Sequence, residues 1–251
     1  MRNRKFVKPL LIVVAMILVC IMSVFATLAY LTAGDTVKNT FTVGNITIDL
    51  NEAKVDEYGN PVYKTDEDGE FILDEEGNKI LEDRVDGNKY KLVPNREYTK
   101  DPTITVDKMS EDCYLRAIIT VTKGKALADL DYTADFDPAT PAINVTEAFQ
   151  FEWGEGWSVH DVNYDNNGTT DNTADDVYVI EARYANKVLY NKDADQIFKV
   201  FTHFTTPDVT NTELATLEGM EITVNAQAIQ ADTFANAAAA FAALDNAVAN
   251  A

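Results

Sequence analysis

The chain has 251 residues, of which 41 are acidic and 21 basic, and its formal net charge at pH 7 is −20. A surface of this sign repels the phosphate backbone of nucleic acids and anionic membranes, so the composition excludes nucleic-acid binding as a function. Hydrophobic residues make up 46% of the chain, which is enough to form a core despite the charge.

The first thirty residues have the pattern of a secretory signal peptide. A basic start (Arg2, Arg4, Lys5, Lys8) precedes an apolar run over 9–26, and small residues at alternate positions follow. We expect residues 1–29 to be removed by a cut between Ala29 and Tyr30. The alternative is an uncleaved membrane anchor, because 9–31 is long enough to span a bilayer. In both cases the basic flank stays in the cytoplasm and the remainder is exported.

Cleavage changes both the charge and the cysteine content. It leaves 17 basic and 41 acidic side chains, a net charge of −24, and it removes Cys20, so that Cys113 is the single thiol. An intrachain disulfide is then impossible, which is typical of bacterial export rather than of an oxidising secretory pathway. Cys113 begins an alternating apolar pattern, so we interpret it as a small core residue.

The N-terminal segment of the mature chain, residues 30–44, is β-prone and ends at a break. Gly-Asn at 44–45 interrupts it, and the apolar alternation resumes on the opposite parity at Ile46, Ile48 and Leu50. A change of parity indicates a bulge or a corner between two strand segments.

Residues 51–89 form an acidic insertion. It contains three copies of an Asp-Glu-x-Gly turn, at 56–59, 66–69 and 74–77, each followed by short β-prone segments. This pattern predicts an acidic β-hairpin insertion that protrudes from the domain. Its carboxylates could bind cations, but we favour the interpretation that they form a solvated edge that blocks unwanted strand pairing.

The rest of the chain predicts an all-β domain, a jelly-roll β-sandwich over residues 45–232. Short alternating segments separated by polar and proline-containing turns are typical of such folds, and we expect about eight to ten strands. An Ala-rich helix is expected at 233–251, with Asp232 as its N-cap and with Phe234 and Phe241 packed against the sandwich.

An Asn/Asp-rich stretch is the candidate metal site. Oxygen ligands recur at alternate positions, and calcium is the cation that they fit: Asp161, Asn163, Asp165, Asn167 and Asp171. The likeness to an EF-hand loop is partial, because the glycine is displaced and the twelfth position is Asn172 instead of Glu. The alternative is an ordinary inter-strand loop. Apart from calcium, the sequence suggests no cofactor.

Four stretches in order resemble the TasA/camelysin family of exported surface and biofilm-fibre proteins. They read AYLT at 29–32, NTFTVGNITIDL at 39–50, YTKDPTITV at 98–106 and VNAQAIQAD at 224–232. The likeness covers most of the mature chain apart from the acidic insertion. It implies a jelly-roll domain, a leader removed by a dedicated signal peptidase, and assembly into extracellular fibres.

The resemblance also implies donor-strand complementation, in which the N-terminal segment of one subunit adds a strand to the next. Residues 30–43 suit the donor role, and burial of Phe41 and Val43 would contribute roughly 1.5–3 kcal/mol each. Such a contact does not close on itself and therefore propagates a filament. The alternative is that 36–43 form an edge strand of their own domain. The donor-strand residues are Thr36, Val37, Asn39, Phe41 and Val43.

Camelysin-like relatives are classed as metallopeptidases, which makes zinc chemistry the enzymatic alternative. Such peptidases need an HExxH pair and a third ligand, whereas the two histidines here, His160 and His203, lie in separate segments. The sequence also lacks a Gly-x-Ser-x-Gly elbow and a His-assisted cysteine. Trp153 and Trp157 bracket Gly-Glu-Gly, where core anchoring is favoured over carbohydrate stacking.

The sequence therefore predicts a secreted, non-enzymatic fibre subunit on a Gram-positive type of cell surface or in its biofilm matrix. Its expected partners are further copies of itself, the signal peptidase and other matrix proteins, with membrane contact only through the uncut leader. Two alternatives remain: a monomeric or membrane-anchored surface module that binds calcium, glycan or protein, and a camelysin-like metallopeptidase.

Overall fold

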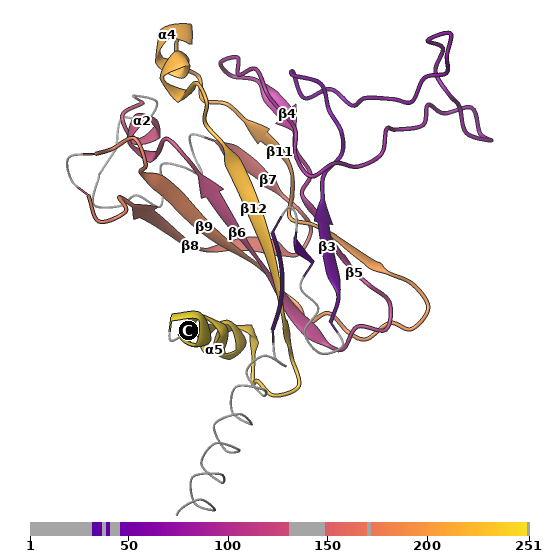
Figure 1. Cartoon of the computed structure of the whole chain (residues 1–251), viewed down its shortest axis with the longest axis vertical. Helices are drawn as coiled ribbons and strands as arrows, with labels where there is room; N and C mark the ends of the chain where they lie inside the picture. Colours follow the sequence, from indigo (N-terminus) through magenta and orange to yellow (C-terminus); the bar gives the residue numbers. More distant parts are fainter. Residues whose placement is uncertain (1–31, 37–38, 41–45, 131–148, 170–171, 250–251) are drawn as a thin grey trace, which may run out of the picture.

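Antiparallel strands make up most of the regular structure, as the alternating apolar pattern predicts. The computed structural model describes residues 32–36, 39–40, 46–130, 149–169 and 172–249. Its largest sheet has six strands (Figure 1). In sheet order these are β2 (Asn39–Thr40), β1 (Thr32–Thr36), β12 (Ile222–Gln230), β6 (Cys113–Val121), β9 (Val177–Tyr184) and β8 (Trp157–Asp165).

Two three-stranded sheets complete the β-structure. The first contains β10 (Gln196–Lys199), β5 (Thr103–Val106) and β3 (Ile48–Asn51). The second contains β4 (Glu97–Thr99), β11 (Phe201–Thr205) and β7 (Gln150–Trp153). The helices are short except for the last one: α2 (Gly124–Ala128), α4 (Asn211–Leu214), the 3-10 turn η1 (Ala215–Leu217) and α5 (Ala237–Ala249).

The core lies between the large sheet and the two smaller ones. Alternate residues of β6, including Leu115 and Ile119, are fully buried, and β12 pairs with β6 over all of its nine residues. Aromatic rings fill the space under the second small sheet, where Tyr98 stacks on Phe204 with ring centroids 5.1 Å apart. Cys113 is buried at the start of β6, which confirms its place in the core.

The C-terminal helix covers the opposite face of the large sheet (Figure 1). Phe241 is buried in a cluster of its own with Ile229, separate from the main core. The guanidinium of Arg116 lies 4.7 Å from the centre of the Phe241 ring and binds the carboxylate of Asp245 in a two-pronged contact. A cation that touches both an aromatic face and a carboxylate fixes the helix by charge and by packing.

The helix begins later than the sequence suggests. Its first turn is capped by Asn236, whose Oδ1 accepts a hydrogen bond of 2.9 Å from the backbone N–H of Ala239. Asp232 is therefore not the N-cap, because an asparagine nearer to the alanine run satisfies the free backbone donors. Phe234 packs against the helix cluster from outside the helix.

The acidic insertion protrudes from the sandwich, as predicted (Figure 1). Its described backbone forms isolated bridges, such as Thr65 with Phe71 and Leu73 with Lys79, in place of the continuous ladder of a β-hairpin. The three Asp-Glu-x-Gly turns account for this shape, because each reverses the chain before a ladder can extend. Of the described residues 60–87, none is buried.

The described part of the N-terminal segment lies at the edge of the large sheet. Strand β1 pairs with β12 in antiparallel register from Thr32 opposite Ile229 to Thr36 opposite Asn225. Strand β2 then folds back on β1. In this single chain residues 32–36 thus pair in cis. Among the described residues no helix is long and apolar enough to cross a membrane.

Cys113 offers a first test of the packing. Burial raises the pKa of its thiol to about 12, and the mature chain starting at Tyr30 contains no other cysteine. Because the thiolate is the reactive form, we expect the native protein at about pH 8 to react with a disulfide reagent at least a hundredfold more slowly than the urea-unfolded protein. Rapid reaction of the native thiol would show that the start of β6 is open.

A second test concerns the C-terminal helix. The Phe241→Ala substitution should lower the free energy of unfolding by about 3–5 kcal/mol, because it leaves a cavity under α5. Val248→Ala is the matched control, since 70% of Val248 is exposed on the same helix. Urea denaturation of both variants measures the difference. Equal stability of the two would mean that α5 does not dock through Phe241.

Candidate functional site

A hollow of about 930 Å³ lies beside the first half of β12. One wall is the edge of β12 at Ile222–Val224, together with the turn of α4 and η1 that precedes it. The facing wall is the end of β3 and residues 86–92, where the acidic insertion returns to the domain. The site therefore joins a strand edge to the base of the insertion.

The wall formed by β12 has backbone hydrogen-bonding groups without a strand partner among the described residues. The pairing of β1 with β12 ends at Asn225, and no strand of the described residues pairs with Ile222–Val224 on that side. The N–H of Thr122 donates to the carbonyl of Glu221 at 3.0 Å, so the backbone of Glu221 faces β6. Because backbone groups alternate in direction along a strand, those of Ile222 and Val224 face the hollow. They form a template for a further strand.

The turn before β12 is held by a capping box. Thr210 Oγ1 accepts from the N–H of Glu213 at 3.3 Å, and the Glu213 carboxylate accepts from the N–H of Thr210 at 2.8 Å. The Thr210 hydroxyl also donates to the Glu213 carboxylate at 2.7 Å, and this bond together with the one from the Thr210 N–H lowers the pKa of Glu213 below its usual value. The reciprocal bonds stabilise the first turn of α4, which lines the hollow.

A buried ion pair supports the facing wall. Lys100 Nζ lies 2.6 Å from Glu52 Oε2, and the side chains are only 8% and 4% exposed. Asn88 completes the cluster by donating to Glu52 Oε1 at 2.9 Å and to the carbonyl of Ala53 at 2.8 Å. Buried charges are tolerated only where each has a partner, so these residues fix the base of the insertion against β3 and β4.

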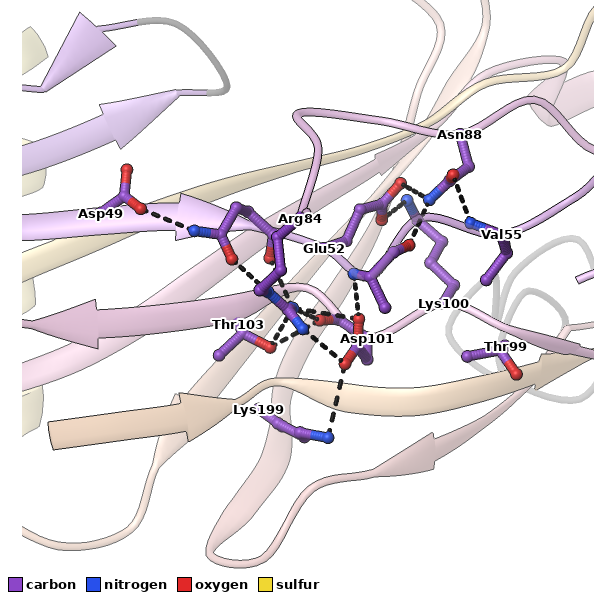
Figure 2. Close-up of polar contacts among 12 residues, drawn as sticks. Asp49, Glu52, Val55, Arg84, Asn88, Thr99, Lys100, Asp101, Thr103 and Lys199 are labelled. Atoms are coloured by element: carbon purple, nitrogen blue, oxygen red, sulfur yellow. Dashed lines mark hydrogen bonds and ion pairs between the residues drawn. The ribbon is translucent and has the colours of Figure 1, made fainter. Parts of the chain in front are cut away.

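Arg84 makes the second attachment of the insertion (Figure 2). Its guanidinium contacts both carboxylate oxygens of Asp101 at 3.1 Å and donates to Thr103 Oγ1 at 2.7 Å. It also donates to the carbonyl of Asn51 at 3.1 Å, which ties the returning chain to the end of β3. Lys199 Nζ lies 3.4 Å from Asp101 and adds β10 to the same cluster. The wall is therefore rigid.

The sequence-predicted cleavage and donor residues fall partly outside the described residues. Ala29 and Tyr30 lie outside them, as do Val37, Phe41 and Val43. Thr36 is the last residue of β1 and Asn39 the first of β2, and they pair with each other.

The predicted calcium ligands are not gathered around one point. Asp161, Asn163 and Asp165 lie on the exposed side of β8, so the expected loop begins only after Asp165. Alternate spacing here reflects the two-residue period of a strand, which sets the side chains in a row. Asn163 donates to Asp161 at 2.7 Å, Asn167 lies in the turn beyond with φ +50°, and Asp171 lies outside the described residues.

The structure places the remaining candidates in separate positions. His160 is on β8, and His203 is on β11 in another sheet, where its Nδ1 lies 2.9 Å from Glu152. Within the described residues no three His, Cys, Asp or Glu side chains are placed to hold a metal ion. Trp157 is buried beside Tyr184, which supports its interpretation as a core anchor.

No protein-family model, curated protein or solved structure matches the chain. The strand edge and its hollow are therefore the features from which a function is inferred.

Sequence reasoning missed the residues that build the walls of the hollow. Glu52 could have been noticed in the sequence. It follows Ile48 and Leu50 at the same two-residue spacing, so it occupies a position on the buried side of the strand where an apolar residue is expected. A carboxylate on a buried face requires a cationic partner. Lys100 and Arg84 had no such signal, because their partners are distant in sequence.

The buried pair gives a third prediction. Lys100→Met leaves the Glu52 carboxylate buried without its cation, and we expect a loss of about 3–5 kcal/mol in the free energy of unfolding. Lys125→Met is the control, because it breaks an exposed pair with Asp129 and should cost less than about 0.5 kcal/mol. Adding Glu52→Gln to Lys100→Met should restore much of the loss. Equal urea midpoints for the two single variants would contradict the role of the pair.

Proposed function

We propose that this protein is an exported structural subunit of surface or biofilm-matrix fibres of the TasA/camelysin type. In the fibre, residues 30–43 of one subunit would pair with β12 of the next. The observation that carries the proposal is the β12 edge at Ile222–Val224, which extends beyond β1 and faces a hollow large enough for a strand.

The length of β12 favours a strand from another subunit over the cis arrangement. In cis, β1 pairs with five residues of β12, from Asn225 to Ile229. The strand itself has nine residues, so an incoming segment of fourteen residues could pair along all of it. The same main-chain bonds would form in trans as in cis, with further bonds at Ile222 and Val224. Replacing the chain's own β1 with the segment of another subunit would therefore keep the antiparallel pairing with β12 and add hydrogen bonds at its first residues.

The sheet connections support a jelly roll as the fold of the subunit. The chain passes from β5 in one small sheet to β6 in the large sheet, then to β7 in the other small sheet and back to β8 and β9. Strands that alternate between two layers in this way are typical of jelly rolls. The fold leaves β12 near an edge, where a strand can be added.

Export and charge would control when assembly occurs. Before cleavage the leader holds residues 30–43 near the membrane, so the cut at Ala29–Tyr30 would release the donor segment. The mature subunits then carry a net charge of −24 each and repel one another. We therefore expect assembly to be faster at higher ionic strength, where this repulsion is screened.

Electron microscopy of purified mature protein tests the proposal. The chain starting at Tyr30 should form filaments, and the chain starting at Asn45 should remain monomeric because it lacks the donor. Ile222→Pro should abolish or shorten the filaments, because proline lacks the N–H that faces the hollow. Proline is tolerated at the first residue of a strand, and no hydrogen bond to β6 is lost there.

The controls separate assembly from folding. Ile222→Val keeps the backbone donor and should assemble normally, and circular dichroism should show folded monomers for Ile222→Pro. Filaments from the chain starting at Asn45, or monomers from both lengths, would refute strand donation by residues 30–43. Monomers from both would favour a surface binding module.

A further inference from the structure

The acidic insertion contains a three-sided backbone ring that the proposed fibre function does not use. Three segments spaced eight residues apart, 63–65, 71–73 and 79–81, form its sides. Their central residues are joined in a cycle: Ile72 N–H donates to Lys64 at 3.0 Å, Ile80 to Ile72 at 3.0 Å, and Lys64 to Ile80 at 2.8 Å. Each segment thus donates one bond and accepts one.

The corners of the ring are built to keep their shape. In the turn at 66–70, Asp66 Oδ1 accepts from the N–H groups of Asp68 and Glu70, both at 3.0 Å. Asp74 does the same in the next turn, with Glu76 and Asn78. Gly69 and Gly77 have φ of +84° and +87°, which glycine adopts without strain. The ring is therefore ordered by backbone bonds and Asp side chains.

This ordered ring presents large apolar side chains to solvent. Phe71, Ile72, Leu73 and Leu81 are 47%, 40%, 53% and 51% exposed. Phe71 meets the Tyr63 ring edge to face, yet none of the described residues 60–87 is buried, so these side chains stay accessible. An exposed apolar cluster on an ordered projection is typical of a surface for a partner.

The chemistry of the partner follows from the charges around the cluster. Residues 51–89 contain thirteen acidic and five basic residues. The basic residues are largely occupied: Lys64 pairs with Asp83, and Lys79 Nζ lies 3.6 Å from the centre of the Phe71 ring. Among the described residues, no cation pairs with the carboxylates of Glu67, Asp68, Glu75 and Glu76.

Lys79 shows which group the aromatic surface accepts. Its ammonium lies above Phe71 and 5.4 Å from the centre of Tyr63, while the two rings meet edge to face at 6.0 Å. A cation over an aromatic face is favourable, and more so when a partner removes water from it. The ring therefore combines apolar anchors, aromatic faces and unpaired carboxylates.

We propose that this ring of the acidic insertion docks an extended protein segment in which lysine or arginine alternates with apolar residues. The apolar residues would cover Phe71 and Leu73, and the cations would meet the turn carboxylates at 66–70 and 74–78. A second copy of this chain is a poor occupant, because each mature copy carries a net charge of −24. An anionic membrane is repelled for the same reason.

The test measures binding of a fluorescent peptide of alternating lysine and valine, about ten residues long, to the mature protein by fluorescence anisotropy. We expect binding that weakens as salt rises, and no binding of the matched peptide of alternating glutamate and valine. Phe71→Ser combined with Leu73→Ser should weaken binding at least about tenfold, as expected when apolar anchors are removed. Glu67→Gln, Glu75→Gln and Glu76→Gln together should weaken it and flatten the salt dependence.

The control removes exposed apolar residues elsewhere. Val159→Ser combined with Ile197→Ser changes two exposed side chains on β8 and β10 and should leave the affinity unchanged. If the Phe71→Ser/Leu73→Ser variant bound the lysine peptide as tightly as the Val159→Ser/Ile197→Ser variant, binding would depend on general charge attraction alone, and the proposal would be overturned. Self-association that depends on Phe71 and Leu73, or equal binding of the glutamate peptide, would also overturn it. Filament formation is measured separately, so either proposal can fail alone.

Discussion

The pairing of β12 with β6 is the interaction on which the rest of this structure depends. It runs over nine residue pairs, from Ile222 opposite Val121 to Gln230 opposite Cys113. One face of the paired strands lines the main core, and the other receives α5 through Ile229 and Arg116. The edge of β12 that faces away from β6 pairs with β1 over Asn225–Ile229 and lines the hollow at Ile222–Val224. Core, helix, N-terminal segment and candidate site thus share one strand.

The scarce cations of this acidic chain are used inside the fold. Lys100, Arg84 and Arg116 each join segments that are distant in sequence, and Lys100 and Arg116 are buried. Arg116 is bound to Gln227 as well as to Asp245, so it links β12 to α5. With these cations committed to internal contacts, carboxylates of the described insertion, such as those of Glu67 and Glu75, have no cation beside them. The exterior is therefore strongly acidic, as the net charge of −20 requires, and it attracts cationic groups more than anionic ones.

The sandwich and the acidic insertion are ordered by different physical means. The sandwich buries alternating apolar side chains, and its order follows from the hydrophobic effect. The protruding part of the insertion buries none of its described residues and is ordered by short backbone cycles and Asp-capped turns. Hydrogen bonds from the backbone and the side chain of Asn78 lower the pKa of Asp74, so the turn at 74–78 favours the charged form of its carboxylate. An element of this kind can hold apolar residues in solvent.

Local patterns predicted the parts of the fold that local physics controls. The apolar alternation that begins at Cys113 predicted a strand, which the structure contains as β6, and the alanine run predicted α5. The Asp-Glu-x-Gly repeats predicted three turns, because aspartate and glycine set the backbone there. The loop expected at Asp161 to Asp165 was wrong, because these residues belong to β8, where alternate polar residues lie on the exposed side of a strand.

The sequence by itself determined the strands, the turns, the helix and the sign of the surface charge, because each depends on residues that are close together in the chain. Only the tertiary structure decided that the pairing of β1 with β12 stops at Asn225 and leaves Ile222–Val224 facing a hollow. It also brought Glu52 to Lys100 and Arg84 to Asp101, and it closed 63–65, 71–73 and 79–81 into a ring. These features depend on sheet order and register, which arise when distant segments pack together.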